Sequence, residues 1–195
     1  MLARGVRGYP AMAQTSYRPE ALTLEVDGGE RVPAILQRPR TTAPVPAVLL
    51  LHGFSSRKER MAESIGRSLL AAGVASLAID LPLHGAREGG LEELSLRNPL
   101  ALVQKWRLAL REANHAIEHL ARHAAVDSAR LGLAGYSLGA YLGMIVAGDN
   151  RLVRAVALAA GGDLPEETPF ASLVPEQSCL AWGIQPYNLP TGPQR

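Results

Sequence analysis

The stretch Gly135-Tyr136-Ser137-Leu138-Gly139 decides the fold of this chain. The aliphatic run at 130–134 before it predicts a buried strand, and the pattern at 138–147 after it predicts a helix. A serine between such elements sits on a sharp strand-to-helix turn that exposes its hydroxyl. Glycines two positions to either side let strand and helix pass closely. The start of the following helix adds free N–H groups and the positive end of its dipole.

Length and composition limit the number of domains, the kinds of partner and the cellular compartment that we expect. The 195 residues suffice for one domain with a sizeable core, and 47% hydrophobic with 19% charged residues is ordinary globular composition. A formal net charge of +2 gives no reason to expect nucleic acid or an anionic membrane surface as a partner. No stretch reaches the roughly 18 apolar residues of a membrane span. The single cysteine, Cys179, excludes an internal disulfide and fits a reducing compartment, so we expect a cytoplasmic protein.

Strand and helix patterns alternate along most of the chain. An apolar helical stripe of Met61, Ile65, Leu69 and Ala72 predicts one helix over 59–72. Expected strands cover 21–26, 32–37, 47–51, 74–79, 130–134 and 153–159, and expected helices cover 59–72, 100–124 and 138–147. The turn residues Asp27-Gly28-Gly29 predict that the first two strands form a hairpin. This alternation predicts an α/β fold with a mainly parallel sheet and helices on both faces.

The two ends of the chain lack such patterns. Residues 1–19 are expected to be a disordered leader without the apolar segment of a secretion signal. The core is expected over 20–160, followed by an irregular tail at 161–195 that holds six of the fourteen prolines. One weak strand pattern at 178–183 is all that the tail offers.

Two further motifs follow predicted strands. The run 47–51 ends in His52-Gly53-Phe54, and the run 74–79 ends in Asp80-Leu81-Pro82-Leu83-His84-Gly85. Together with the serine turn, and in this order, the motifs resemble the α/β-hydrolase superfamily, closest to its dienelactone hydrolase and serine-peptidase-like esterase branches. The resemblance covers roughly residues 20–160, and it implies a sheet that normally continues for two more strands.

The resemblance assigns roles to particular residues. It implies that Ser137 is the nucleophile, and that the backbone N–H groups of Leu138 and Phe54 form the oxyanion hole. The implied reaction is hydrolysis of a carboxylic ester or related acyl bond of a small molecule, with no cofactor. It leaves the substrate and the oligomeric state open.

The catalytic base is missing from its usual place. All five histidines precede Ser137, whereas the family places its acid and then its histidine after the nucleophile. Asp163 is a candidate acid, and His84 folding over the site is a candidate alternative base. Three explanations stay open: a chain truncated or frame-shifted after about residue 172, a shortened non-catalytic relative that serves as a binding module, or an unusual base. An incomplete chain that does not fold stably is a further alternative.

Several other residues have a structural interpretation and a functional one. We expect His52 to hold the loop after its strand, and Asp80 and His84 to organise theirs. His115, His119 and His123 share a helix face that we interpret as solvated or an interface rather than a metal site. Arg57, Lys58 and Arg60 could meet an anionic substrate, but a solvated helix start is the simpler interpretation. Trp106 is expected to lie in the hydrophobic core or to cover it.

Overall fold

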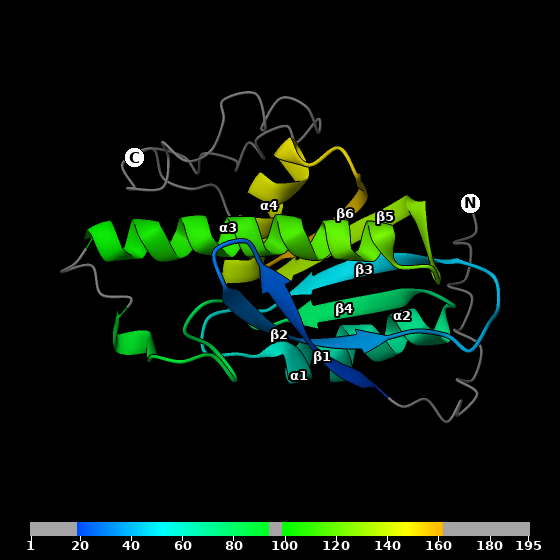
Figure 1. The fold of residues 1–195 in the computed structure, drawn as a ribbon, viewed down its shortest axis with the longest axis horizontal. Helices are drawn as coiled ribbons and strands as arrows, with labels where there is room; N and C mark the ends of the chain where they lie inside the picture. Colours follow the sequence, from blue (N-terminus) through cyan, green and yellow to red (C-terminus); the bar gives the residue numbers. More distant parts are fainter. Residues whose placement is uncertain (1–18, 94–98, 162–195) are drawn as a thin grey trace, which may run out of the picture.

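Six strands form one sheet at the centre of the computed structural model, which describes residues 19–93 and 99–161 (Figure 1). The strands are β1 (Glu20–Val26), β2 (Glu30–Gln37), β3 (Val45–Leu51), β4 (Ala75–Ile79), β5 (Val126–Tyr136) and β6 (Val153–Ala159). Their order across the sheet is β1-β2-β4-β3-β5-β6. The hairpin β1–β2 is antiparallel and joins β4 antiparallel, while β4, β3, β5 and β6 run parallel. The predicted mainly parallel α/β architecture is confirmed.

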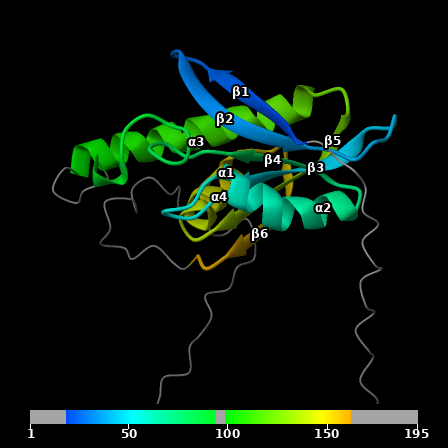
Figure 2. The same cartoon turned by 90° about the horizontal axis from the view of Figure 1, so that it is seen from below.

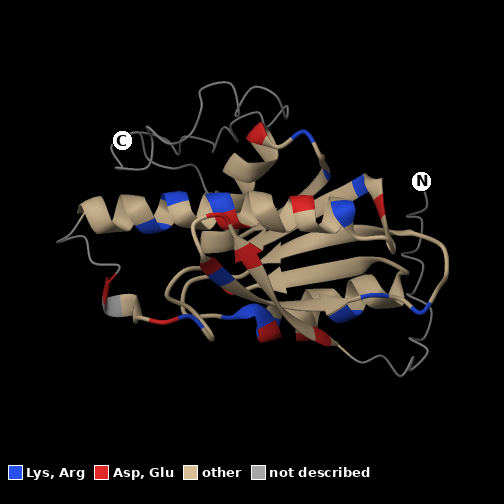
Figure 3. Cartoon of the chain, in the orientation of Figure 1, with Lys and Arg blue, Asp and Glu red and all other residues tan. Residues whose placement is uncertain are grey.

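The central strands are buried because they carry no charge. Sequences VPAVLLL in β3 and ASLAI in β4 place aliphatic residues on both faces, as parallel strands covered by helices require. Figure 3 shows these two strands free of charged residues, which lie on the helices, the loops and the other strands. The predicted hairpin turn is confirmed, because Gly28 and Gly29 adopt positive φ angles of 100° and 82° and close it.

Helices cover both faces of the sheet and divide the core in two. The long α3 (Pro99–Arg122) and α4 (Leu138–Asp149) bury the larger cluster against β3 and β5. The short helices α1 (Lys58–Met61) and α2 (Arg67–Ala71) flank the π-helical turn η1 (Ala62–Gly66) and bury a smaller cluster on the opposite face (Figure 2). A 3-10 turn, η2 (Leu91–Glu93), precedes the undescribed residues 94–98. No helix within 19–93 and 99–161 is long and apolar enough to cross a membrane.

The predicted helix over 59–72 is confirmed, because residues 58–71 are helical without a break, but its middle is a π turn that the α-helical periodicity does not predict. The π turn at 62–66 holds one residue more than an α turn, which rotates the residues after it relative to the sheet. Ile65 is therefore 37% exposed and Ala72 is exposed, although the periodic stripe predicts both as buried. Gly66 is buried instead, where a Cβ atom would overlap the side chain of Gln37.

Other boundaries differ modestly from the predictions. The strand expected at 130–134 begins four residues earlier, as β5, and the strand expected at 47–51 begins two residues earlier, at Val45, as β3. The leader at 1–19 and the tail at 161–195 fall almost wholly outside the described residues, together with the weak strand pattern at 178–183.

The carboxyl ends of the parallel strands meet at one edge of the sheet. Leu51 of β3 is in register with Ile79 of β4 and with Gly135 of β5, and Tyr136 is in register with Ala159 of β6. The residues that follow these strand ends are therefore neighbours in space. This alignment brings the three sequence motifs to one place, as ligand sites in open α/β sheets require.

Candidate active site

Ser137 forms the turn between β5 and α4 in a strained conformation. Its φ of 50° and ψ of −114° are unusual for a residue with a side chain. Its N–H donates to the carbonyl oxygen of Ala159 at 2.9 Å, and its own carbonyl accepts from Ala140 N–H at 2.8 Å. The neighbouring strand and the helix thus hold the turn in place.

The two glycines around Ser137 are required by close backbone contacts. A Cβ atom on Gly135 would overlap the backbone of Gly139, and one on Gly139 would overlap the backbone of Leu51. Neither partner is a flexible side chain that could move aside. The predicted close passage of strand and helix is confirmed.

The loop after β3 lies directly against Ser137. A Cβ atom on Gly53 would be 3.3 Å from Ser137 Cβ and 3.0 Å from the ring of Tyr136. The loop turns sharply, since Ser56 N–H donates to Gly53 O at 3.1 Å. Phe54 therefore follows a backbone segment in contact with the serine. Leu138 is the first residue of α4, where helix geometry leaves N–H groups without an intrahelical acceptor.

His52 clamps this loop to the next one. Its Nδ1 lies 2.8 Å from Gly53 O, and its Nε2 accepts a hydrogen bond from Leu81 N–H at 3.1 Å. A carbonyl can only accept, so Nδ1 carries the proton and the ring is in its neutral form. Burial lowers the pKa of His52, which favours the same form. The predicted loop-holding position of His52 is confirmed.

Asp80 anchors the loop after β4 to the start of α1. Its fully buried carboxylate accepts hydrogen bonds from Lys58 N–H at 2.9 Å, Lys58 Nζ at 2.7 Å and Ala86 N–H at 2.9 Å. Gly85 wraps around it with a positive φ of 60°, where a Cβ atom would overlap the carboxylate. The expectation that Asp80 organises its loop is confirmed.

The expectation of a solvated helix start is wrong for Lys58. This residue is 7% exposed, because its ammonium group lies between Asp80 and Glu59, 2.7 and 2.8 Å away. Burial alone would lower the pKa of Lys58, but the hydrogen bonds to these two carboxylates outweigh it and raise the pKa. The Lys58 charge is thus committed to the loop rather than offered to a ligand.

His84 lies beside the same loop, buried to 4% exposure. Its ring is 5.0 Å from that of His52 and 5.6 Å from that of Phe54, measured between centroids. Nδ1 lies 2.7 Å from Pro82 O, which ties the ring to its own loop, whereas Nε2 is buried and has no hydrogen-bond partner in the described part of the chain. Phe54, His84 and Leu138 together line a pocket of about 180 Å³. Three of the predicted site residues therefore meet.

A buried ion pair that the sequence analysis did not predict fixes the rest of this loop. Arg87 donates to both carboxylate oxygens of Glu112 at 2.9 and 2.8 Å, and Glu112 is fully buried in α3. Burial raises the pKa of Glu112, and the Arg87 guanidinium opposes that shift. The sequence did contain an indication that Glu112 is buried, because it lies on the apolar face of α3, four residues after Leu108 and four before Ala116.

The remaining residues singled out from the sequence are not part of the Ser137 turn or of the loops around it. His119 and His123 face each other on α3 with ring centroids 6.3 Å apart, and burial followed by the neighbouring His123 lowers the pKa of His119. Within 19–93 and 99–161 no group of three or more ligating side chains could hold a metal ion. Trp106 is buried as expected. Asp163 lies outside the described residues, so its role as acid stays a prediction.

Comparison with known proteins defines the class. The model of the alpha/beta hydrolase family matches residues 48–191, and the chain belongs to this family. It is 29% identical over 119 residues to the polyketide transferase ATR5 of Stachybotrys chlorohalonatus, covering 60% of this chain and 37% of that protein.

Solved structures agree with the fold. A cold-adapted esterase from an Arctic intertidal metagenomic library superposes with a TM-score of 0.62 at 23% identity, covering 77% of this chain and 63% of that one. A dienelactone hydrolase from Anabaena variabilis gives 0.55 at 20% identity, covering 74% and 63%. The chain thus spans less than two thirds of each of these three proteins.

Proposed function

We propose that this chain is a serine-dependent hydrolase of carboxylic esters or related acyl bonds of small molecules. The observation that carries the proposal is the strained Ser137 turn with the backbone of Gly53 packed against it. Such strain persists only where the surrounding structure enforces it, and it is typical of functional sites. Family membership supports hydrolytic acyl chemistry in general, and the choice of an ester follows the esterase and the dienelactone hydrolase among the structures that share this fold.

The proposed reaction begins with Ser137. Its Oγ attacks the acyl carbonyl carbon, which forms a tetrahedral intermediate and then an acyl-enzyme with loss of the alcohol. The N–H groups of Leu138 and Phe54 donate to the developing oxyanion. Losing one such donor typically slows a reaction by about 100- to 1000-fold. Water then releases the acid. No step in this scheme needs a cofactor.

The attack also requires a base that accepts the proton of the Ser137 hydroxyl. His52 is a poor candidate, because both of its ring nitrogens already form hydrogen bonds. His84 keeps an unpartnered Nε2 and stays the candidate base among the described residues. Asp163 stays the candidate acid.

We infer a cytoplasmic location from the single cysteine, Cys179.

Labelling with a fluorophosphonate, read by intact mass, tests the proposal. We expect one adduct on the wild-type chain and none on Ser137→Ala. Serines at 55 and 56 lie on the neighbouring loop, so Ser56→Ala is the matched control and should label like the wild type. A folded wild-type chain that does not label would contradict the proposal. It would favour a binding module that retains the turn without an activated serine.

A further inference from the structure

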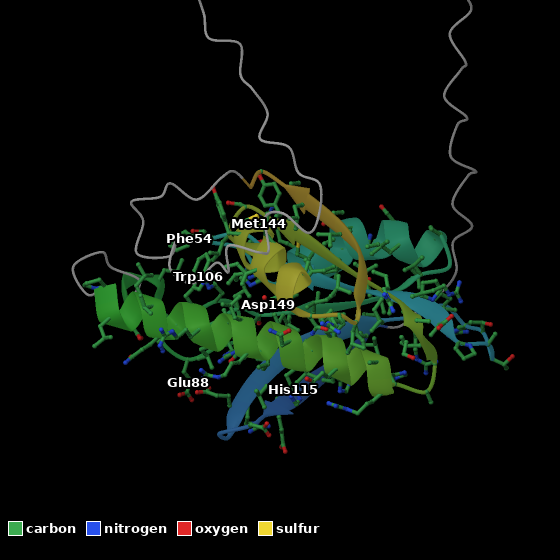
Figure 4. The ribbon with its side chains drawn as sticks, turned by 90° about the horizontal axis from the view of Figure 1, so that it is seen from above. Phe54, Glu88, Trp106, His115, Met144 and Asp149 are labelled. Atoms are coloured by element: carbon green, nitrogen blue, oxygen red, sulfur yellow. The ribbon has the colours of Figure 1, made fainter. Side chains whose placement is uncertain are left out.

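A small pocket of about 180 Å³ lies between α3 and the residues around the Ser137 turn. Apolar side chains form most of its wall: Phe54, Leu81, Leu138 and Leu142 on one side, and Trp106 and Ala109 of α3 on the other. Figure 4 shows Phe54 and Trp106 close together, although they belong to the loop after β3 and to α3.

The pocket offers a ligand little charge. None of the described residues that line it is acidic, and Lys105 is the one lysine or arginine among them. The Lys105 ammonium group lies 3.8 Å from a carboxylate oxygen of Glu93, so its charge already has a partner. The group that suits this pocket is therefore apolar.

The inner wall of the pocket is part of the hydrophobic core. Leu81, Trp106, Ala109 and Leu142 all belong to the larger core cluster and are buried. Phe54 is 53% exposed and forms the outer part of the pocket. Close-packed core side chains do not move aside for an oversized group without cost. The inner wall thus sets an upper limit on the size of the group that the pocket accepts.

The pocket borders the proposed reaction centre. Leu138 follows Ser137 directly, and Phe54 follows Gly53, whose added Cβ atom would be 3.3 Å from Ser137 Cβ. In the proposed reaction the alcohol leaves first, while the acyl group stays attached to the serine until water attacks. A pocket with core walls suits the group that stays, because the alcohol must diffuse away.

We propose that this pocket holds the acyl group of the substrate and restricts it to compact apolar chains or rings. An apolar cavity of about 150 Å³ holds benzene, so this pocket accommodates an acyl group of about four to seven carbons. A hydroxyl or a charge on that group would exchange water for apolar walls, which is costly. The proposal rests on the proposed hydrolase function and deepens it by naming the substrate class. Ala109 determines specificity, since a larger side chain there would occupy the space.

A series of 4-nitrophenyl esters tests the acyl assignment, because only the acyl group changes. Burial of each methylene strengthens binding about fourfold, so kcat/KM, relative to spontaneous hydrolysis, should rise at least tenfold from acetate to 3-methylbutanoate. It should not rise further from hexanoate to decanoate. The 3-hydroxybutanoate ester has the shape of the 3-methylbutanoate ester and should react about tenfold more slowly. Equal rates for either of these pairs that should differ, or a rise that continues to decanoate, would overturn the proposal.

Two substitutions on α3 change the pocket in opposite directions. Ala109→Leu fills it and should lower kcat/KM for 3-methylbutanoate about tenfold while leaving acetate unchanged. Leu102→Ala enlarges it and should raise kcat/KM for decanoate relative to hexanoate about threefold or more. Ala121→Leu, near the far end of the same helix, is the matched control and should change neither ratio.

The two variants also provide the results that would contradict the acyl assignment. An equal loss on every ester in Ala109→Leu would place the alcohol in the pocket and overturn it, as would wild-type selectivity in both pocket variants. Circular dichroism shows whether each variant is folded. If Ala109→Leu does not fold, Leu102→Ala decides the question alone, since Leu102 is only half-buried.

Binding of toluene separates a failure of the pocket from a failure of the hydrolase function. It is followed by NMR at the indole N–H signal of Trp106, assigned with Trp182→Phe. We expect toluene to bind the wild type and Ser137→Ala alike, and Ala109→Leu at least about tenfold more weakly. This pattern in a chain that neither reacts with fluorophosphonate nor hydrolyses the esters would refute the hydrolase function, and with it the acyl assignment. Ester hydrolysis by a chain that does not bind toluene, or binds it equally well as Ala109→Leu, would overturn the pocket proposal alone.

Discussion

Arg87→Met should be among the most damaging single changes outside the strand core. It removes both hydrogen bonds to Glu112 and leaves that carboxylate buried in α3 without its cation. The side chains of Arg87 and Glu112 are 9% and 0% exposed, so water cannot replace the lost partner. Breaking a buried pair by removing one member typically costs about 3–5 kcal/mol.

Protonation of Glu112 sets a ceiling on this cost. Neutralising a carboxyl group of ordinary pKa near 4.3 at pH 7 costs about 3.7 kcal/mol, and at pH 5 only about 1 kcal/mol. In the variant the folded-state pKa of Glu112 is raised, so stability is retained below the unfolded pKa and is lost as pH rises above it. We therefore expect a loss of about 3–4 kcal/mol at pH 7 that shrinks by about 2–3 kcal/mol at pH 5, relative to the wild type.

Urea unfolding followed by circular dichroism at both pH values measures this directly. The matched control is Arg122→Met, which breaks the exposed pair with Glu118 at 3.3 Å and should cost under about 0.5 kcal/mol. The double variant with Glu112→Leu should recover most of the loss, because an apolar pair leaves no buried charge. The reasoning is refuted if Arg87→Met costs no more than the control, or if its cost is the same at pH 5 and pH 7.

Two further predictions concern the site itself. Gly139→Ala would place a Cβ atom on the backbone of Leu51 and should destabilise the fold by about 3 kcal/mol or more. Gly143→Ala, on the same helix, would contact only the ends of leucine side chains, which can move, and should cost under about 1 kcal/mol. Thermal melting of the two variants measures this difference. Burial lowers the pKa of His52, so its contribution to stability is present above the unfolded pKa of about 6.5 and is lost as pH falls below that value, by about 1.4 kcal/mol per pH unit. Urea unfolding from pH 7.5 to 5.5 should show this slope in the free energy of unfolding. His52→Gln should reduce the slope by the amount that corresponds to one bound proton.

The strands and the serine turn could be predicted because their determinants are local. Mostly aliphatic, uncharged runs indicate β3 and β4, and the glycines around Ser137 indicate a close backbone contact that only glycine permits. The helix over 59–72 was predicted, but the π turn at 62–66 was not; Gly66 at its end fits closely against Gln37 of β2, a contact that only the surrounding fold provides. Periodicity within the segment does not contain that information.

The site was predicted in its parts but not in its connections. Ser137, Phe54, Leu138 and His84 were all singled out, and the aligned strand ends bring them to one edge of the sheet. The burial of Lys58 was missed because its partner Asp80 lies 22 residues away, on a different loop. A charge at a helix start looks solvated unless the fold that surrounds it is known.

The three hydrogen bonds that Asp80 accepts also restrict the length of its loop. Lys58 and Ala86 are both held by this one carboxylate, so the segment 81–85 must span a fixed gap. An insertion or deletion within it would pull Ala86 away or displace Gly85 from its fit around the carboxylate. Length variation introduced by engineering is therefore best placed after Glu88, where the pocket wall at His84 keeps its position while the neighbouring surface is redesigned.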